Sequence, residues 1–101
     1  MQTELTPSKA VFSGELQGSA TALQLPNIPC TMVWFSALSS NAGNVYLGGA
    51  GVTVADGTTD VTTGLEITPG MVIGPIPIDN LSRLYRICDN AGDDITYLAV
   101  G

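Results

Sequence analysis

Short apolar segments separated by Gly, Pro, Asn and Asp recur along the whole 101-residue chain, and this spacing constrains the fold most. The segments are rich in Val, Ile and Thr, which favour strands, and no stretch carries a helical apolar period of useful length. Twelve Gly and six Pro residues supply the turns between them. The sequence predicts an all-β protein without substantial helix: a single β-sandwich or compact jelly-roll-like barrel of about seven or eight short antiparallel strands.

The positions of the strands follow from the apolar runs and their flanking turns. We expect strands at 9–13, 20–25, 30–38, 44–49, 65–67, 71–78, 84–88 and 95–100. The last two, joined by a polar turn at 89–94, predict a terminal hairpin. A corner or bulge is expected at the glycines of 48–51, a loop at 54–64, and a type II turn at Thr68-Pro69-Gly70.

The first residues differ from the rest of the chain. Residues 1–8 (MQTELTPS) are polar and unpatterned, so we expect a flexible N-terminal arm or a segment that orders only against a neighbour. Residues 9–101 form one β-sandwich domain without an internal repeat. No basic flank precedes an apolar run near the start, and apolar stretches fall far short of the roughly 20 residues of a membrane span. We expect a soluble, unsecreted protein without a membrane partner.

Charge and apolar content bear on the partners. Three basic residues against nine acidic ones give a net charge of −6, which repels a phosphate backbone, so we expect no nucleic-acid partner. Only 12% of the residues are charged and 45% are hydrophobic, which is apolar for so short a chain. Part of this apolar surface is therefore expected to face another protein.

Enzymatic chemistry has few candidates. The chain has no histidine, which excludes Ser-His-Asp and Cys-His nucleophiles and His-ligated zinc. The run Gly48-Gly49-Ala50-Gly51 lacks the lysine and the βαβ context of a phosphate loop. Cys30 and Cys88 are read as two buried thiols; a single disulfide is the alternative. We expect neither an enzyme nor a cofactor.

Two acidic clusters are the candidate metal ligands. Asp89, Asp93 and Asp94 form one, and Asp56 with Asp60 forms the other, and carboxylate oxygens suit Ca²⁺. Asp also caps turns through its own side chain, and neither loop has the ligand set of an EF-hand. Local turn capping is the preferred interpretation, and no metal is predicted.

Two features indicate surfaces that contact other molecules. Trp34 and Phe35 are adjacent on one predicted strand, so they face opposite sides and only one need lie in the core. The other is available for a subunit interface or, as an alternative, for stacking on a sugar. Pro75 and Pro77 cannot donate to a strand ladder, so they place their segment at a sheet edge or a protein interface.

An ordered set of short motifs resembles a family of small virion structural proteins of tailed bacteriophages, of the capsid decoration (cement) or fibre-base type. The set spans residues 29–100 and comprises Pro29-Cys30 before an apolar strand, NAGNVYLGG at 41–49, Leu65 with Pro69-Gly70, Asp79-Asn80-Leu81, Leu84-Tyr85, and AGDDITYL at 91–98. The sequence departs from the family's pattern in its stretch from 51 to 64 and in Pro75 and Pro77.

The resemblance implies a β-sandwich subunit carried in many copies on the particle. We expect a homotrimeric decoration protein that is assembled in the host cytoplasm, binds the major capsid protein on the outer surface of the head and bridges capsid subunits. The acidic charge suits an outward-facing location, because packaged DNA lines the interior. The candidate interface residues are Met1, Gln2, Thr3, Glu4, Leu5, Trp34, Pro75 and Pro77.

Two alternatives stay open. One is a component of the tail, neck, baseplate or fibre base, which the same sandwich serves at a lower copy number. The other is a carbohydrate- or host-surface-binding module in which aromatic rings stack on sugars. Its candidate residues are Trp34, Tyr46, Tyr85 and Tyr97.

Overall fold

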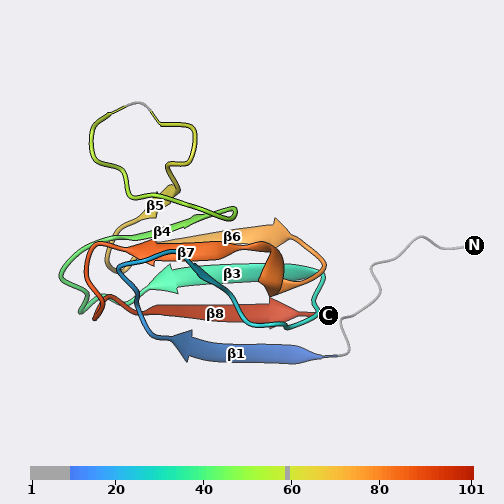
Figure 1. Cartoon of the computed structure of the whole chain (residues 1–101). Helices are drawn as coiled ribbons and strands as arrows, with labels where there is room; N and C mark the ends of the chain where they lie inside the picture. Colours follow the sequence, from blue (N-terminus) through green and yellow to red (C-terminus); the bar gives the residue numbers. More distant parts are fainter. Residues whose placement is uncertain (1–9, 59) are drawn as a thin grey trace, which may run out of the picture.

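Two four-stranded antiparallel sheets packed face to face make up the described part of the protein (Figure 1). The structure, a computed structural model, describes residues 10–58 and 60–101. The predicted arm at 1–8 lies outside the described residues. Within the described ranges the only helix is a 3-10 turn, η1 (Leu81–Arg83), and no helix is long and apolar enough to cross a membrane. The all-β prediction is confirmed.

Each sheet combines strands from both halves of the chain. Sheet A has the order β1-β8-β3-β6, and its strands are β1 (Val11–Leu16), β8 (Ile95–Val100), β3 (Met32–Ala37) and β6 (Val72–Pro77). Sheet B has the order β2-β7-β4-β5, and its strands are β2 (Leu23–Gln24), β7 (Tyr85–Cys88), β4 (Val45–Gly48) and β5 (Leu65–Ile67).

The strand pairing identifies the topology. β1 pairs with β8, β2 with β7, β3 with β6 and β4 with β5, as in one long antiparallel ribbon that doubles back between β4 and β5. Wrapping that ribbon into two sheets gives the eight-stranded jelly roll. Every connection except the one from β4 to β5 therefore crosses from one sheet to the other.

The predicted terminal hairpin is wrong. β7 lies in sheet B between β2 and β4, whereas β8 lies in sheet A between β1 and β3. The polar turn at 89–94 carries the chain across the sandwich. A turn of this length and composition serves a hairpin or a crossing equally well, and the two apolar strands each gain two partners by separating.

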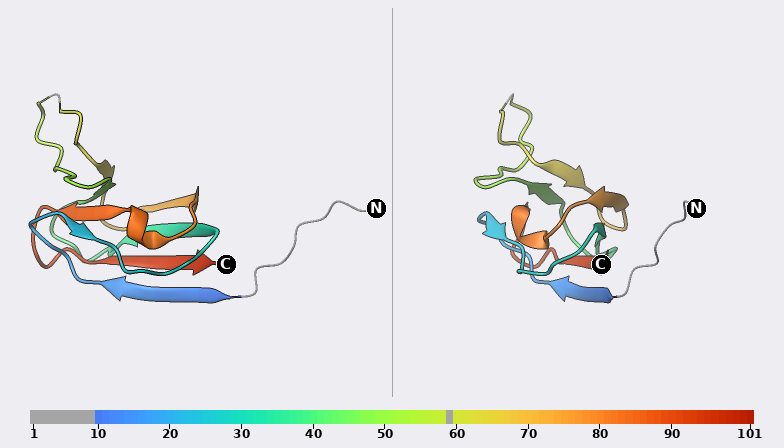
Figure 2. Two further views of the ribbon diagram at one scale, coloured as in Figure 1. Left: turned by 45° about the vertical axis from the view of Figure 1, so that its right-hand side comes forward. Right: turned by 90° about the vertical axis from the view of Figure 1, so that its right-hand side faces the viewer.

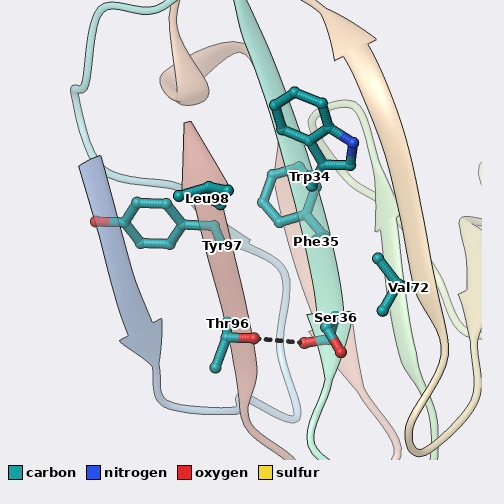
Figure 3. Close-up of a pocket in the computed structure, with 7 residues that line it drawn as sticks. All are labelled: Trp34, Phe35, Ser36, Val72, Thr96, Tyr97 and Leu98. Atoms are coloured by element: carbon teal, nitrogen blue, oxygen red, sulfur yellow. Dashed lines mark hydrogen bonds between the residues drawn. The ribbon is translucent and has the colours of Figure 1, made fainter. Parts of the chain in front are cut away.

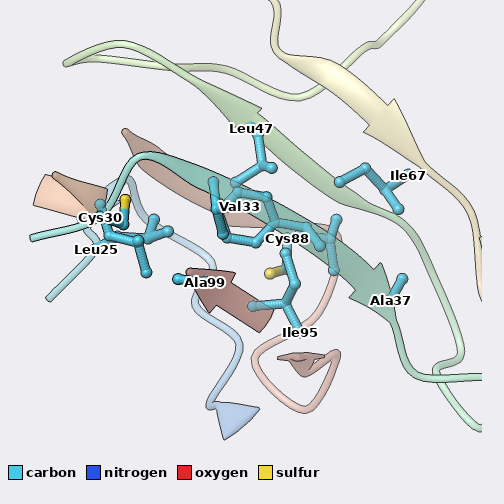
Figure 4. Packing of buried hydrophobic residues seen from close by; sticks show 12 residues of the cluster. Leu25, Cys30, Val33, Ala37, Leu47, Ile67, Cys88, Ile95 and Ala99 are labelled. Atoms are coloured by element: carbon cyan, nitrogen blue, oxygen red, sulfur yellow. The ribbon is translucent and has the colours of Figure 1, made fainter. Parts of the chain in front are cut away.

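Strand alternation builds the core between the sheets (Figure 4). On β3, Val33, Phe35 and Ala37 are buried, while Trp34 and Ser36 point outward and are half-buried. The buried hydrophobic cluster comprises Leu25, Cys30, Val33, Phe35, Ala37, Val45, Leu47, Ile67, Leu81, Cys88, Ile95 and Ala99. The prediction that Trp34 and Phe35 face opposite sides is confirmed.

The connections agree in part with the sequence. Gly70 has a φ of 84° and the Met71 N–H donates to the Thr68 carbonyl over 2.9 Å, so the predicted type II turn is present. A turn also follows β4, where the Val52 N–H donates to the Gly49 carbonyl. Residues 53–58 and 60–63 stand away from the sandwich as parts of a loop (Figure 2).

One buried carboxylate links two of the connections that cross between the sheets. Asp93, which is 1% exposed, accepts hydrogen bonds from the backbone N–H groups of Ala42, Gly43 and Asn90 and from the Asn90 side chain. Burial acts to raise the pKa of Asp93, but these donors together lower it below its ordinary value. The carboxylate therefore joins the 38–44 connection to the 89–94 turn as a charged acceptor.

Candidate interaction face

The outer face of sheet A, the side that points away from sheet B, is the candidate interaction face. Register places its side chains in cross-strand rows: Val11–Val100–Met32–Pro77, Ser13–Leu98–Trp34, and Glu15–Thr96–Ser36–Val72. Trp34 lies in the middle row, beside Leu98 (Figure 3). A shallow hollow of about 340 Å³ opens here, lined by Trp34, Phe35, Ser36, Val72, Thr96, Tyr97 and Leu98.

Large apolar side chains on this face are exposed to solvent. Val11 is 67% exposed, Val72 63%, Leu98 43% and Met32 39%. They come from all four strands, and register connects them: Val11 and Met32 flank Val100 in one row, while Val72 and Leu98 line the hollow with Trp34. Together they form a contiguous patch rather than isolated apolar residues. Exposed apolar patches are typical of protein–protein or membrane interaction sites and of ligand-binding grooves.

Strand β6 borders the face on one side. Pro75 and Pro77 are both exposed on this strand. Among the described strands β6 pairs with β3 alone, so the prediction that the prolines lie at a sheet edge is confirmed. The register shifts between Val33 and Phe35, where the β6 backbone bulges. Gly74 lies at this bulge and packs closely on Trp34. A Cβ added to Gly74 would lie 3.0 Å from both Cα and Cδ1 of Trp34. Contact of this edge with another protein stays a prediction.

The remaining predicted interface residues are not placed. Met1, Gln2, Thr3, Glu4 and Leu5 lie outside the described residues. Of the predicted set, the structure brings together Trp34 and the β6 prolines at one side of the same face.

Charge around the face is negative. Glu15 stands at the end of β1, where a hydrogen bond to Asp94, burial and the charge of Asp94 all raise its pKa. Arg83 pairs with Asp79 on the surface, and Arg86 is buried and donates to the carbonyls of Gln17 and Gln24. Across residues 10–58 and 60–101, no arginine or lysine is left free to attract a phosphate.

The acidic loops cap turns. Both Asp93 oxygens accept from N–H donors, and Asp56 and Asp60 accept from the backbone N–H and hydroxyl of Thr58 and Thr62. These hydrogen bonds lower the pKa of both loop aspartates. In the described part of the chain, no three His, Cys, Asp or Glu side chains gather to hold a metal ion.

The four aromatic residues considered for sugar stacking are divided between the two sheets. Tyr46 is buried at 2% exposure, and Tyr97 packs on Gly14 of the neighbouring strand. Trp34 lies on sheet A and Tyr85 on sheet B. Trp34 and Tyr97 both line the hollow on the candidate interaction face, whereas Tyr46 and Tyr85 lie on sheet B. The four residues therefore do not form one stacking platform, and sugar binding stays a prediction.

Both cysteines are buried free thiols, as the sequence predicted. Burial is the main cause that raises the pKa of each thiol. Cys30 lies against the carbonyl of Ile78, and Cys88 lies in the cluster between the sheets. Neither sulfur is an accessible, activated nucleophile.

Sequence reasoning missed most of the apolar patch. Val11, Met32 and Val72 lie outside the quoted motifs, and Leu98 was quoted only as part of a motif and not as a surface residue. Each became part of one surface only through the pairing of β1, β8, β3 and β6. The available signal was the alternation on β3, since Met32 shares the face of Trp34. Comparisons of the chain with known protein families, with curated proteins and with solved structures found no significant match.

Proposed function

We propose that this chain is a homo-oligomeric decoration (cement) protein that binds the outer surface of a bacteriophage head. In this proposal the candidate interaction face of sheet A binds the major capsid protein, and bridging of neighbouring capsid subunits stabilises the head. The single observation that supports it most is the contiguous exposed apolar patch around Trp34. The motif resemblance supplies the class of partner.

The physical argument is one of burial. Covering an apolar patch releases roughly 25 cal/mol per Å² of apolar area, so a contact of modest size stabilises each copy on the head by a small amount. Many equivalent copies add these amounts over a whole particle. The low charge of the face favours this use, since Glu15 is the only charged side chain in its cross-strand rows.

Charge also supports an outward location. Both arginines of the described residues have partners: Arg83 forms an ion pair with Asp79, and Arg86 donates to backbone carbonyls. Carboxylates cap exposed turns. A surface of this sign is repelled by packaged DNA and tolerated on the outside of a head. The homotrimer expected from the sequence stays a prediction.

A co-sedimentation experiment tests the proposal. Undecorated heads are mixed with the purified chain, pelleted and assayed for the bound chain. Leu98→Lys places a charge in the patch beside Trp34 and is expected to weaken binding at least about tenfold, because the desolvated charge has no partner. Glu66→Lys, on the exposed surface of sheet B, is the matched control and is expected to bind like the unaltered chain.

The outcomes separate the roles. Binding that saturates at a fixed ratio to the capsid protein and is lost in Leu98→Lys supports the proposal. Equal loss in both variants would place the contact elsewhere and contradict the role of this face. Binding to isolated tails and not to heads would overturn decoration in favour of a tail component.

A further inference from the structure

The four sheet edges are unequally protected. In sheet B, β2 has two residues and β5 has three, so neither offers a long ladder. In sheet A, β6 carries two prolines and a bulge. β1 is different: it runs for six residues in unbroken register with β8, contains no proline or lysine, and pairs with no other described strand. Natural proteins blunt the edges that must stay unpaired, so an unblunted edge indicates a partner strand.

The backbone groups that β1 presents are defined by its pairing with β8. Ala10 and Gly101 exchange both of their hydrogen bonds, at 2.8 and 3.0 Å. Antiparallel ladders alternate between hydrogen-bonded and non-hydrogen-bonded pairs, so the even-numbered residues of β1 bond to β8. The N–H and C=O groups of Val11, Ser13 and Glu15 therefore point away from the sheet. β1 forms the lower edge of the sandwich in Figure 1.

We propose that two copies of this chain pair through β1, antiparallel, about a two-fold axis that passes at Ser13. In this register Ser13 lies opposite Ser13 of the second copy, and Val11 lies opposite Glu15. All three outward-pointing residues then form hydrogen-bonded pairs, which gives about six backbone hydrogen bonds. A shift by one residue would set outward-pointing groups against groups already bonded to β8, so the register is restricted.

The side chains suit this register. Glu15 faces Val11 of the second copy, so the two Glu15 carboxylates are separated along the strands. Phe12, which is 38% exposed, lies opposite Gly14 of the second copy. Gly14 has no room for a side chain, because a Cβ there would lie 2.9 Å from the Tyr97 hydroxyl. The exposed Phe12 ring thus meets a position without a side chain, next to the Tyr97 ring.

The pairing deepens the homo-oligomeric part of the proposed function, and it gives a two-fold dimer where the sequence predicts a homotrimer. A two-fold axis perpendicular to the sheet keeps both outer faces on the same side. The two copies of sheet A then form one eight-stranded sheet, and the two apolar patches lie on the same face of it, on either side of the Ser13 pair. The doubled face offers a wider contact than one copy. The contact rests on a single strand pair, so we expect a weak dimer in solution.

Disulfide trapping tests the register with the chain alone. Ser13→Cys is expected to form a covalent dimer on mild oxidation, because hydrogen-bonded Cα pairs lie about 5.5 Å apart, within disulfide range. Val11→Cys and Glu15→Cys alone are expected to stay monomeric, since identical positions are then about 14 Å apart along the strands. A mixture of these two variants is expected to cross-link. The unaltered chain, whose cysteines are buried, is the control.

A second variant tests the edge without a cross-link. Ser13→Pro removes an N–H that points away from β8, so the fold is expected to persist while the dimer is lost in sedimentation equilibrium. Ser13→Ala keeps that N–H and is expected to dimerise. Absence of trapping in Ser13→Cys, or an oligomer that Ser13→Pro leaves intact, would overturn the proposal. Because no head is present, either result is independent of head binding. A monomer that still binds heads would contradict the pairing and leave the proposed head binding standing.

Discussion

Trp34 and Leu98 lie directly opposite each other on β3 and β8, and both point out of the sandwich. Their chain neighbours Phe35 and Ala99 are buried on the other side of the same strands. The two side chains thus form a cross-strand pair on the outer face of the two central strands of sheet A, while the core residues pack on the inner face. An apolar cross-strand pair at the centre of an exposed face stabilises the sheet little and is available to a partner.

Adjacent aromatic residues on β3 are expected to have unequal effects on stability. Phe35→Ala should lower the free energy of unfolding by about 3–5 kcal/mol, because the ring is 1% exposed between the sheets. Trp34→Ala removes an outward ring and should cost clearly less. Urea unfolding followed by circular dichroism measures both. Equal losses would contradict the assignment of Trp34 to a surface.

The Asp93 carboxylate is expected to be needed as a charged acceptor. Asp93→Asn replaces one accepting oxygen by an amide that faces the Asn90 donors, and should cost about 2–3 kcal/mol of stability. Asp60→Asn changes an exposed turn aspartate and serves as the control, with little expected effect. A loss confined to Asp60→Asn would refute the structural role of Asp93.

The same carboxylate predicts part of the acid sensitivity. The pKa of Asp93 is lowered by folding, so its contribution to stability is complete above the unfolded value near pH 4 and disappears as the pH falls through the folded value. The stability of the unaltered chain should therefore fall more steeply below about pH 4 than that of Asp93→Asn. Parallel curves in urea titrations at several pH values would contradict this.

The pH dependence of stability due to Glu15 should have the opposite sign to that of Asp93. The raised pKa of Glu15, due first to the hydrogen bond with Asp94, means that its stabilising contribution exists at low pH and is lost as the pH rises through the folded value. Glu15→Gln retains a donor to Asp94 at every pH. We expect this variant to melt at a higher temperature than the unaltered chain at pH 7, with the difference shrinking towards about pH 4. A difference that does not vary with pH would argue against the pair.

Two glycines near the 89–94 turn make a matched comparison. A Cβ at Gly18 would lie 2.2 Å from the Asp93 carbonyl oxygen, so Gly18→Ala should cost about 2 kcal/mol or more. Gly92 has open space around it and no positive φ, so Gly92→Ala should be neutral or stabilise by up to about 1 kcal/mol. Thermal unfolding distinguishes the two. If Gly18→Ala were tolerated, the segment around Gly18 would not be in close contact with the 89–94 turn.

The sequence was sufficient for the fold class because local chemistry defines the strands and turns. Strand alternation separated Phe35 from Trp34, and the Pro69-Gly70 turn formed as its residues require. The partners of each strand were harder to predict, because strand pairing joins residues that are far apart in the sequence. The 89–94 turn looked like a hairpin, yet Asp93 binds it to the 38–44 connection and the chain crosses between sheets.

The candidate site was predictable only in part. Trp34 and the β6 prolines could be selected one by one, because an outward aromatic and a proline each limit what a strand can do. Leu98 and Val72 belong to the same patch only because β8 and β6 both flank β3. Their exposure is a property of the assembled sheet and not of any local motif.

The most direct test of the central claim is quantitative mass spectrometry of purified virions, which counts this chain relative to the major capsid protein. Decoration of the outer surface predicts on the order of hundreds of copies per particle, because every equivalent capsid position binds one. Absence from the virion would contradict the structural role. About six or twelve copies would contradict decoration and assign the chain to the tail or neck.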